Sequence, residues 1–104
     1  MSEFASDNLG EVLDESLDDF DEPPRYRVLL HNDHYTTMEF VVEILQEVFH
    51  HNRARAEQIM LMVHRQGVGC CGEYDREIAE SKVEAVTRRA TKAGFPLRCT
   101  MEKK

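Results

Sequence analysis

The sequence predicts an α+β fold in which a single small β-sheet packs against three helices. Three short segments have strand character, and helical patterns separate them in the order strand–helix–helix–strand–helix–strand. Two helices between the first two strands, and one between the last two, favour a single sheet with its helices on one face. Residues 23–104 are long enough to fold alone, although around a small core.

The first strand is expected over Arg25–Leu30, because this stretch combines aromatic, β-branched and other apolar residues. Tyr26, Val28 and Leu30 would share one face of the sheet, since side chains alternate along a strand. The polar residues 31–35 are rich in turn formers and predict a loop.

The first helix is expected to begin with a capping box, in which Thr36 is the N-cap and Glu39 reaches back to it. Tyr35 and Phe40 occupy the two positions of a hydrophobic staple. The helix is expected to run to about Phe49, with apolar residues buried on one face and glutamates exposed on the other. The buried set is Val41, Leu45 and Val48, and the exposed set is Glu39, Glu43 and Glu47.

A second helix is expected over Arg53–Gln66, with Asn52 as its N-cap and Gly67 as the left-handed residue that ends it. Val68–Tyr74 predicts a second strand, which its two glycines weaken.

Asp75 is expected to cap a third helix that runs to Ala93 and is closed by Gly94. The alternation of apolar and polar residues over Leu97–Glu102 predicts the last strand.

Charge divides the chain into two parts. Met1–Glu22 holds nine acidic residues and no Lys or Arg, whereas Pro23–Lys104 holds eleven acids and thirteen bases. We therefore predict a disordered acidic N-terminal extension over residues 1–22, joined at Pro23-Pro24 to a folded domain over residues 23–104. Two interpretations of the extension stay open, a motif that folds on a partner and a solvated tail. The apolar residues at helical spacing that favour a motif are Leu9, Val12, Leu13, Leu17 and Phe20.

Composition argues against several classes of protein. No apolar run approaches the roughly 18–20 residues of a membrane span, and the N-terminus lacks the pattern of a signal peptide. Three cysteines without a C-x-x-C spacing predict a reducing cytoplasm, not a disulfide framework. A net charge of −7 gives no support to a nucleic-acid partner.

A candidate binding site combines a helix face with a polar loop. His64 lies three or four positions from Met60 and Val63 on the second helix, so the three side chains share a face. The simple alternative is a core histidine bonded to a carbonyl group. However, packing of the helices could bring Asn32-Asp33-His34 and His64 to one rim of a pocket. The floor would be formed by Met38, Val41, Met60 and Val63.

The chemistry of that rim points to an amino group. Asn32, Asp33 and a neutral His64 each offer an acceptor, and an ammonium group has three donors. An apolar hole below would hold a side chain attached next to the ammonium, and methionine lining suits side chains of different shapes. We expect a site for an amino group with a neighbouring hydrophobic group.

Other groups of His, Asp and Cys residues give weaker evidence for a site, and we expect no cofactor and no catalytic residue. Neither His31-x-x-His34 with Asp33 nor the His50-His51 pair has the spacing of a zinc site, so no metal is expected. Cys70 and Cys71 could suggest a thiol nucleophile, but adjacent strand residues point to opposite faces and no orienting group is evident.

The chain resembles the ClpS adaptor family of the bacterial Clp ATP-dependent protease. The resemblance spans about residues 23–104 and is carried by five separated motifs in order. These motifs are Tyr26–Asp33, Tyr35–Val41, Met60-x-x-Val63-His64-x-Gln66-Gly67, Ala79-Glu80-x-Lys82-Val83 and Pro96-Leu97-x-Cys99-Thr100-Met101-Glu102-Lys103.

The resemblance implies a protease adaptor of the N-end rule pathway, not an enzyme. Such an adaptor binds N-degron substrates through a free α-amino group and an N-terminal Leu, Phe, Tyr or Trp, and delivers them to the ClpA unfoldase of the ClpAP protease. It also implies the fold of the ribosomal stalk protein's C-terminal domain, a three-stranded antiparallel sheet against three helices. A general unfoldase-binding module without an N-degron pocket is the alternative.

Site residues follow from the resemblance by position. Asn32 and His64, with Asp33 beside them, correspond to residues that hold the α-amino group. Glu77 and Lys82 correspond to a surface that docks on the N-terminal domain of the AAA+ unfoldase. The hydrophobic pocket corresponds to Thr36, Met38, Val41, Met60, Val63 and Leu97, with Met38 as a gate against β-branched residues.

Two residues depart from the family pattern. His34 stands where an acid is usual, which removes a charge that supports recognition of the amine. Thr37 stands where proline is usual, which removes a rigid residue from the start of the helix. Both departures predict narrower or weaker specificity.

Overall fold

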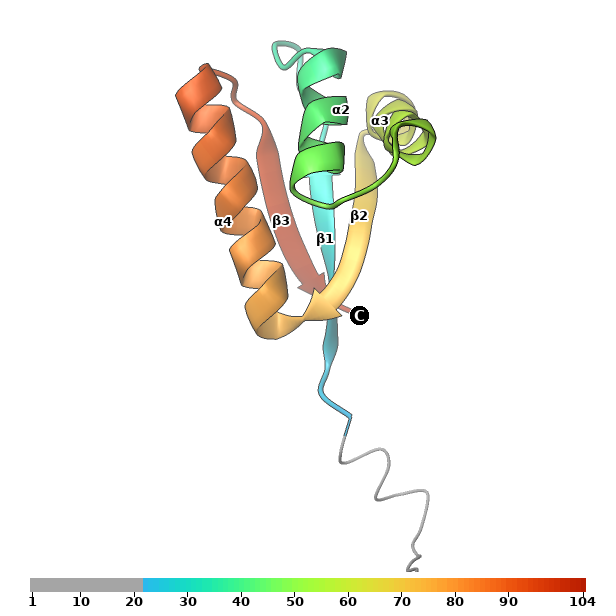
Figure 1. The fold of residues 1–104 in the computed structure, drawn as a ribbon, viewed down its shortest axis with the longest axis vertical. Coiled ribbons are helices and arrows are strands. Elements are labelled where there is room, and N and C mark those ends of the chain that lie inside the picture. The colour runs from blue at the N-terminus through green and yellow to red at the C-terminus, as the bar shows by residue number, and fades with distance from the viewer. Residues whose placement is uncertain (1–21) are drawn as a thin grey trace, which may run out of the picture.

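A computed structural model describes residues 22–104 as a single sheet of three antiparallel strands with three helices (Figure 1). The predicted α+β class, the order of elements and the antiparallel sheet are confirmed. The predicted extension lies outside the described residues, apart from Glu22. The strands are β1 (Arg25–His31), β2 (Val68–Asp75) and β3 (Arg98–Lys103), and the helices are α2 (Met38–Glu47), α3 (Arg53–Gln66) and α4 (Arg76–Ala93).

Strand β1 is central, in the order β2-β1-β3, and pairs antiparallel with both neighbours. Arg25 lies opposite Asp75 at one end of the sheet, and His31 lies opposite Val68 at the other. The register with β2 shifts between Val28 and Leu29, which marks a β-bulge.

The three helices cover one face of the sheet (Figure 1). Helix α4 contacts all three strands, while α3 contacts β2 and packs against α2. Val28 and Leu30 of β1 point into the core, as the alternation predicted. The largest fully buried side chains are Leu30, Ile44, Leu45, Ile59, Val28, Val86 and Cys71.

Helix α2 begins one residue later than predicted. Thr37, not Thr36, is the N-cap, and its side chain accepts a hydrogen bond from the Phe40 amide at 3.1 Å. Thr36 is unavailable as a cap because its amide and hydroxyl both donate to Asp33, at 2.7 Å each. The predicted capping box and staple are therefore wrong. Tyr35 is 77% exposed, and Phe40 stacks on Phe95 with 4.9 Å between ring centroids.

The other helix ends agree with the sequence. Asn52 and Asp75 accept hydrogen bonds at the starts of α3 and α4, and Gly67 and Gly94 end these helices with φ values of 90° and 82°. Helix α2 ends at Glu47, two residues before the predicted Phe49.

Glycine in β2 allows the strand to approach helix α3 closely. A Cβ atom at Gly69 would lie 2.7 Å from Cγ2 of Val63. The glycine that weakens this strand in isolation therefore permits the packing of α3 on the sheet.

Candidate functional site

The loop between β1 and α2 is organised by a single carboxylate. Asp33 Oδ1 accepts hydrogen bonds from the amides of Tyr35 and Thr36, and its Oδ2 accepts one from the Thr36 hydroxyl. Burial alone would raise the pKa of Asp33, but these hydrogen bonds and the nearby His34 outweigh it and lower the pKa below its usual value. The carboxylate is thus charged at neutral pH and fixes the loop.

The loop lies beside the C-terminal end of α3. The Asn32 amide donates to the carbonyl oxygen of Gly67 at 2.9 Å, and Gly67 is the residue that ends α3. This backbone bond sets Asn32 close to the last turn of the helix, where His64 lies. Two segments that are distant in sequence are joined without any side chain.

Between these segments the surface forms a depression of about 230 Å³, which we call the amine pocket after the ligand that the sequence analysis expects. Loop, α2 and α3 all contribute to it, as the sequence analysis predicted for its rim and floor. Its lining residues are Asn32, Asp33, His34, Thr36, Met38, Val41, Met60, Val63 and His64.

Polar groups and apolar groups are separated in the amine pocket. Val41 and Val63 are buried, Met60 is partly buried, and Met38 is 46% exposed at the mouth. Asn32 and His64 are exposed, and within residues 22–104 neither side chain has a hydrogen-bond partner. Their acceptor groups are therefore available to a ligand.

One residue differs from the predicted pocket, and one rim residue was given no role in binding. His34 lines the pocket beside Asn32 and Asp33, as the sequence analysis expected for this loop. Leu97 is 6% exposed, belongs to the hydrophobic core and is not among the lining residues. The approach of the 31–35 loop to α3 depends on the Asn32–Gly67 backbone bond, which no residue pattern signals.

The two residues predicted to dock on the unfoldase, Glu77 and Lys82, line different depressions along α4. Glu77 is exposed and lines a depression with Val83 and Met101, but Lys82 is partly buried on another side of the helix. Lys82 Nζ donates to the Val48 carbonyl oxygen at 2.6 Å. The same ammonium lies 6.0 Å and 5.6 Å from the ring centroids of Phe49 and Tyr74. Lys82 therefore stabilises the end of α2 within its own fold.

Larger depressions of about 640 and 660 Å³ lie along α4. Charged side chains make up four of the seven lining residues of the first depression and three of the seven of the second, and neither lining contains an amide or imidazole acceptor. We therefore regard the smaller amine pocket as the site whose chemistry is specific.

Two buried cysteines and two further histidines, His31 and His51, are engaged within the fold. Burial raises the pKa of the Cys71 thiol well above its ordinary range and that of Cys99 to about 12. His51 Nε2 contacts the Cys71 carbonyl oxygen at 2.6 Å, and His31 Nε2 contacts the Thr100 hydroxyl at 2.8 Å.

No group of three or more His, Cys, Asp or Glu side chains within residues 22–104 is placed to hold a metal ion. In the same range, no helix combines the length and apolar character needed to cross a membrane.

Comparison with known proteins agrees with this arrangement. A family model described as ATP-dependent Clp protease adaptor protein ClpS matches residues 21–100. The ClpS adapter of Desulfatibacillum aliphaticivorans is 50% identical over 102 residues, covering 98% of each chain. The ClpS adapter of Herminiimonas arsenicoxydans is 61% identical over 80 residues, covering 77% of this chain and 78% of the relative.

A solved structure shares the fold. It is Agrobacterium tumefaciens ClpS2 bound to L-phenylalaninamide, with a TM-score of 0.77 and 37% identity. The match covers 80% of this chain and all of that chain. Fold, sequence and family match agree, and the chain belongs to the ClpS family of adaptor proteins of the ATP-dependent Clp protease.

Proposed function

We propose that this adaptor binds proteins by a free N-terminal amino group and the first side chain, and delivers them to a ClpA-type AAA+ unfoldase. The observation that carries the proposal is the amine pocket, where free acceptors of Asn32 and His64 surround an apolar floor. No bond of the substrate is broken, and the protein acts by recognition alone.

The relative's ligand supports the same chemistry. L-Phenylalaninamide carries a free α-amino group and an aromatic side chain, and its carboxyl group is blocked as an amide, as in a peptide. Similarity in fold and sequence makes such a ligand a reasonable one for this chain. Leu, Phe, Tyr or Trp as the first residue would place its apolar side chain over Val41 and Val63.

In this mechanism, the ammonium donates to Asn32 Oδ1 and to an unprotonated ring nitrogen of His64. The Asp33 carboxylate contributes negative charge close to the ammonium, although its oxygens already hold the loop. Burial of the first side chain contributes about 1.5–3 kcal/mol. The proposal also includes docking on the N-terminal domain of the unfoldase, through the exposed Glu77 and the partly exposed Lys82, and a cytoplasmic location.

The test is fluorescence anisotropy with a labelled peptide that begins with Phe, compared with the same peptide acetylated at its N-terminus. Acetylation removes charge and donors and leaves acceptors unpaired, at about 1–3 kcal/mol each, so affinity should fall at least about tenfold. Asn32→Ala and His64→Ala should each weaken binding of the free peptide. Equal binding of the free and acetylated peptides would contradict the proposal.

The alternative, an unfoldase-binding module without an N-degron pocket, makes a different prediction. A panel of the twenty possible first residues would then show no binding, although binding to the unfoldase would persist. Preference for Leu, Phe, Tyr and Trp within the panel supports the proposal.

A further inference from the structure

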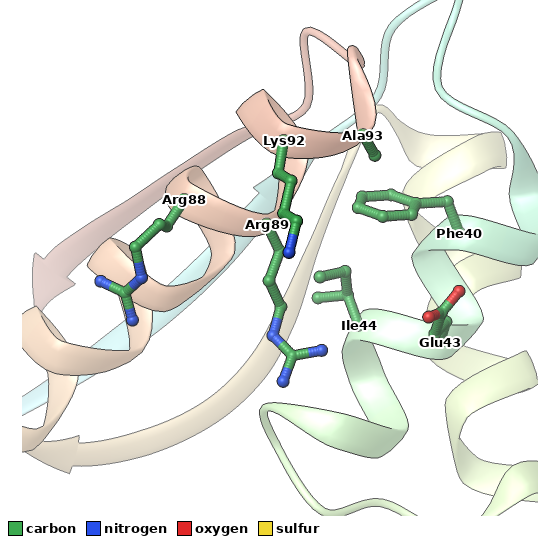
Figure 2. A pocket seen from close by; sticks show the side chains of 7 residues that line it. All are labelled: Phe40, Glu43, Ile44, Arg88, Arg89, Lys92 and Ala93. Carbon is green, nitrogen blue, oxygen red and sulfur yellow. The ribbon is translucent and has the colours of Figure 1, made fainter.

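A second recognition surface lies between α2 and α4, and it shares no residue with the amine pocket. Figure 2 shows its upper part, where Phe40 and Ile44 of α2 lie across from Arg89 and Lys92 of α4. A lower depression of about 400 Å³ shares Arg88 and Arg89 with the upper one and extends along α4 to Ile78. We call the two together the α2–α4 groove.

Apolar and cationic groups line this groove. Phe40, which is partly buried and lies over the fully buried Ile44, gives the upper part an apolar side chain, and Ile78, 47% exposed, does so at the lower end. Four cations stand against two carboxylates along it. The cations are Lys82, Arg88, Arg89 and Lys92, and the carboxylates are Glu43 and Glu47.

Two of the cations are available to a ligand. Arg89 pairs with Glu47, and Lys82 donates to a backbone carbonyl. Within residues 22–104, Arg88 and Lys92 have no carboxylate within 4.0 Å and no hydrogen-bond acceptor. An elongated apolar groove with free cations along its edge fits an amphipathic segment whose polar face is acidic.

The chain itself contains such a segment. Residues 1–22 carry nine acids and no Lys or Arg, and five apolar residues recur between Leu9 and Phe20. Plotted at about 100° per residue, these apolar residues fall within an arc of about 140°, and the acids of residues 11–22 fall on the opposite side. A helix over Leu9–Phe20 would therefore have one apolar face and one acidic face.

The place where the extension enters the fold agrees with this groove. Arg25 of β1 lies opposite Asp75, and Asp75 is the N-cap of α4, so the extension arrives at the end of the groove near Ile78. A helix over Leu9–Phe20 is about 18 Å long, and the groove from Ile78 to Lys92 spans about 21 Å along α4. The few residues before Arg25 can bridge the short remaining distance.

We propose that the acidic N-terminal extension docks in the α2–α4 groove of its own chain. Its apolar residues lie against Phe40 and Ile78, and its carboxylates pair with Arg88 and Lys92. Attachment to the same chain gives a high effective concentration, so a weak contact is enough to fill the groove. The extension is thus held by the body until a competing partner releases it.

The experiment uses tryptophan fluorescence, because the natural sequence contains no Trp. A full-length Leu13→Trp variant should emit at shorter wavelength than the same protein in denaturant, since the indole leaves water. Adding Arg88→Glu and Lys92→Glu should move the emission to longer wavelength. The matched control, Arg55→Glu with Lys103→Glu, reverses two exposed charges outside the groove and should leave the emission unchanged.

A second variant keeps the test valid if the protein with Arg88→Glu and Lys92→Glu fails to fold. Leu9→Ser with Leu17→Ser alters only the extension and should also move the Leu13→Trp emission to longer wavelength. Emission at long wavelength in the parent, or a shift that the groove variants do not affect, would overturn the proposal. An emission shift that grows with protein concentration would assign the groove to a second copy and would overturn it too.

Discussion

At the scale of single residues, Met38 and Asp33 have opposite relations to the amine pocket. Met38 projects at its mouth and remains partly exposed, so it can meet a ligand directly. Asp33 directs its oxygens into the loop, so its effect on a ligand passes mainly through the position of Asn32 and Thr36. Met38 is therefore placed to contact a ligand, whereas Asp33 holds the loop in position.

Met38→Ala should admit peptides that begin with Val or Ile. Shortening the side chain opens the mouth of the pocket to branching at Cβ, which the methionine excludes by contact. The measurement is the affinity ratio of Val-peptide to Leu-peptide. Met62→Ala is the matched control, because Met62 is 37% exposed and is not a lining residue. An unchanged ratio in Met38→Ala would show that Met38 does not act as a gate.

Asp33→Asn should destabilise the fold at neutral pH, and this difference should shrink in acid. The folded state lowers the pKa of Asp33, so the carboxylate stabilises the fold above the unfolded value of about 3.9 and ceases to do so as pH falls through the lower folded value. Urea unfolding of both proteins at several pH values measures the difference in their free energies of unfolding. Glu84→Gln, an exposed carboxylate without an ion pair within residues 22–104, is the control. A difference independent of pH would contradict the assignment.

The residues of the amine pocket could be predicted only in part. His64 beside Met60 and Val63 follows from helical spacing, and the chemistry of Asn32 follows from its functional groups. The Asp33–Thr36 bonds were not predicted, because the spacing of Thr36 and Glu39 favours Thr36 as the N-cap. Asp33, three residues before Thr36 in the same loop, accepts hydrogen bonds from Thr36 instead, and Thr37 becomes the N-cap.

At the scale of elements, the end of α3 has a second role. Gly67 adopts φ of 90° to end the helix, and its carbonyl oxygen receives the Asn32 amide. The helix terminus and the recognition loop therefore depend on the same peptide unit. Sequence analysis predicts the helix end well, since glycine in this position is a strong signal, but the link to the loop is tertiary.

Gly67→Ala should lower the free energy of unfolding by about 1 kcal/mol and also weaken peptide binding. No atom lies within 4 Å of the Cβ position, so backbone strain causes the loss. Gly94→Ala is a close control, because Gly94 has φ of 82° and equally open surroundings at the end of α4. It should cost similar stability but leave affinity for a Phe-peptide intact. Equal effects of both variants on affinity would disprove a special role for Gly67.

At the scale of the whole molecule, residues 23–104 carry a net charge of +2 and residues 1–22 a net charge of −9, and their division into a folded body and an extension stays a prediction. The elements of the body could be predicted almost completely, because capping residues and glycines mark α3 and α4, whereas the cap of α2 was placed one residue too early. The pairing order of the strands could not be predicted, since no local pattern states which strand is central. The resemblance to a family supplied the sheet, and the structure then confirmed it.

Deletion of residues 1–21 should leave peptide affinity unchanged and reduce delivery to the protease. The amine pocket contains no residue before Asn32, whereas handover requires contact with the unfoldase. Degradation of a reporter that begins with Phe by ClpAP measures delivery. Replacing residues 1–21 with a Gly/Ser segment of the same length tests whether delivery depends on the length of the extension or on its sequence. Loss of peptide binding on deletion would contradict the division into body and extension.

The bond between Asn32 and Gly67 has a kinetic consequence. This bond joins the 31–35 loop to the end of α3 in the free protein, so the pocket is preformed. Binding of a ligand then requires no rearrangement of the backbone. Association rates should then lie near the usual 10⁵–10⁷ M⁻¹s⁻¹ for all accepted peptides, to within about tenfold. Differences in affinity between first residues should then appear in the dissociation rates of the peptides. Residence time, more than association rate, would decide which proteins are delivered.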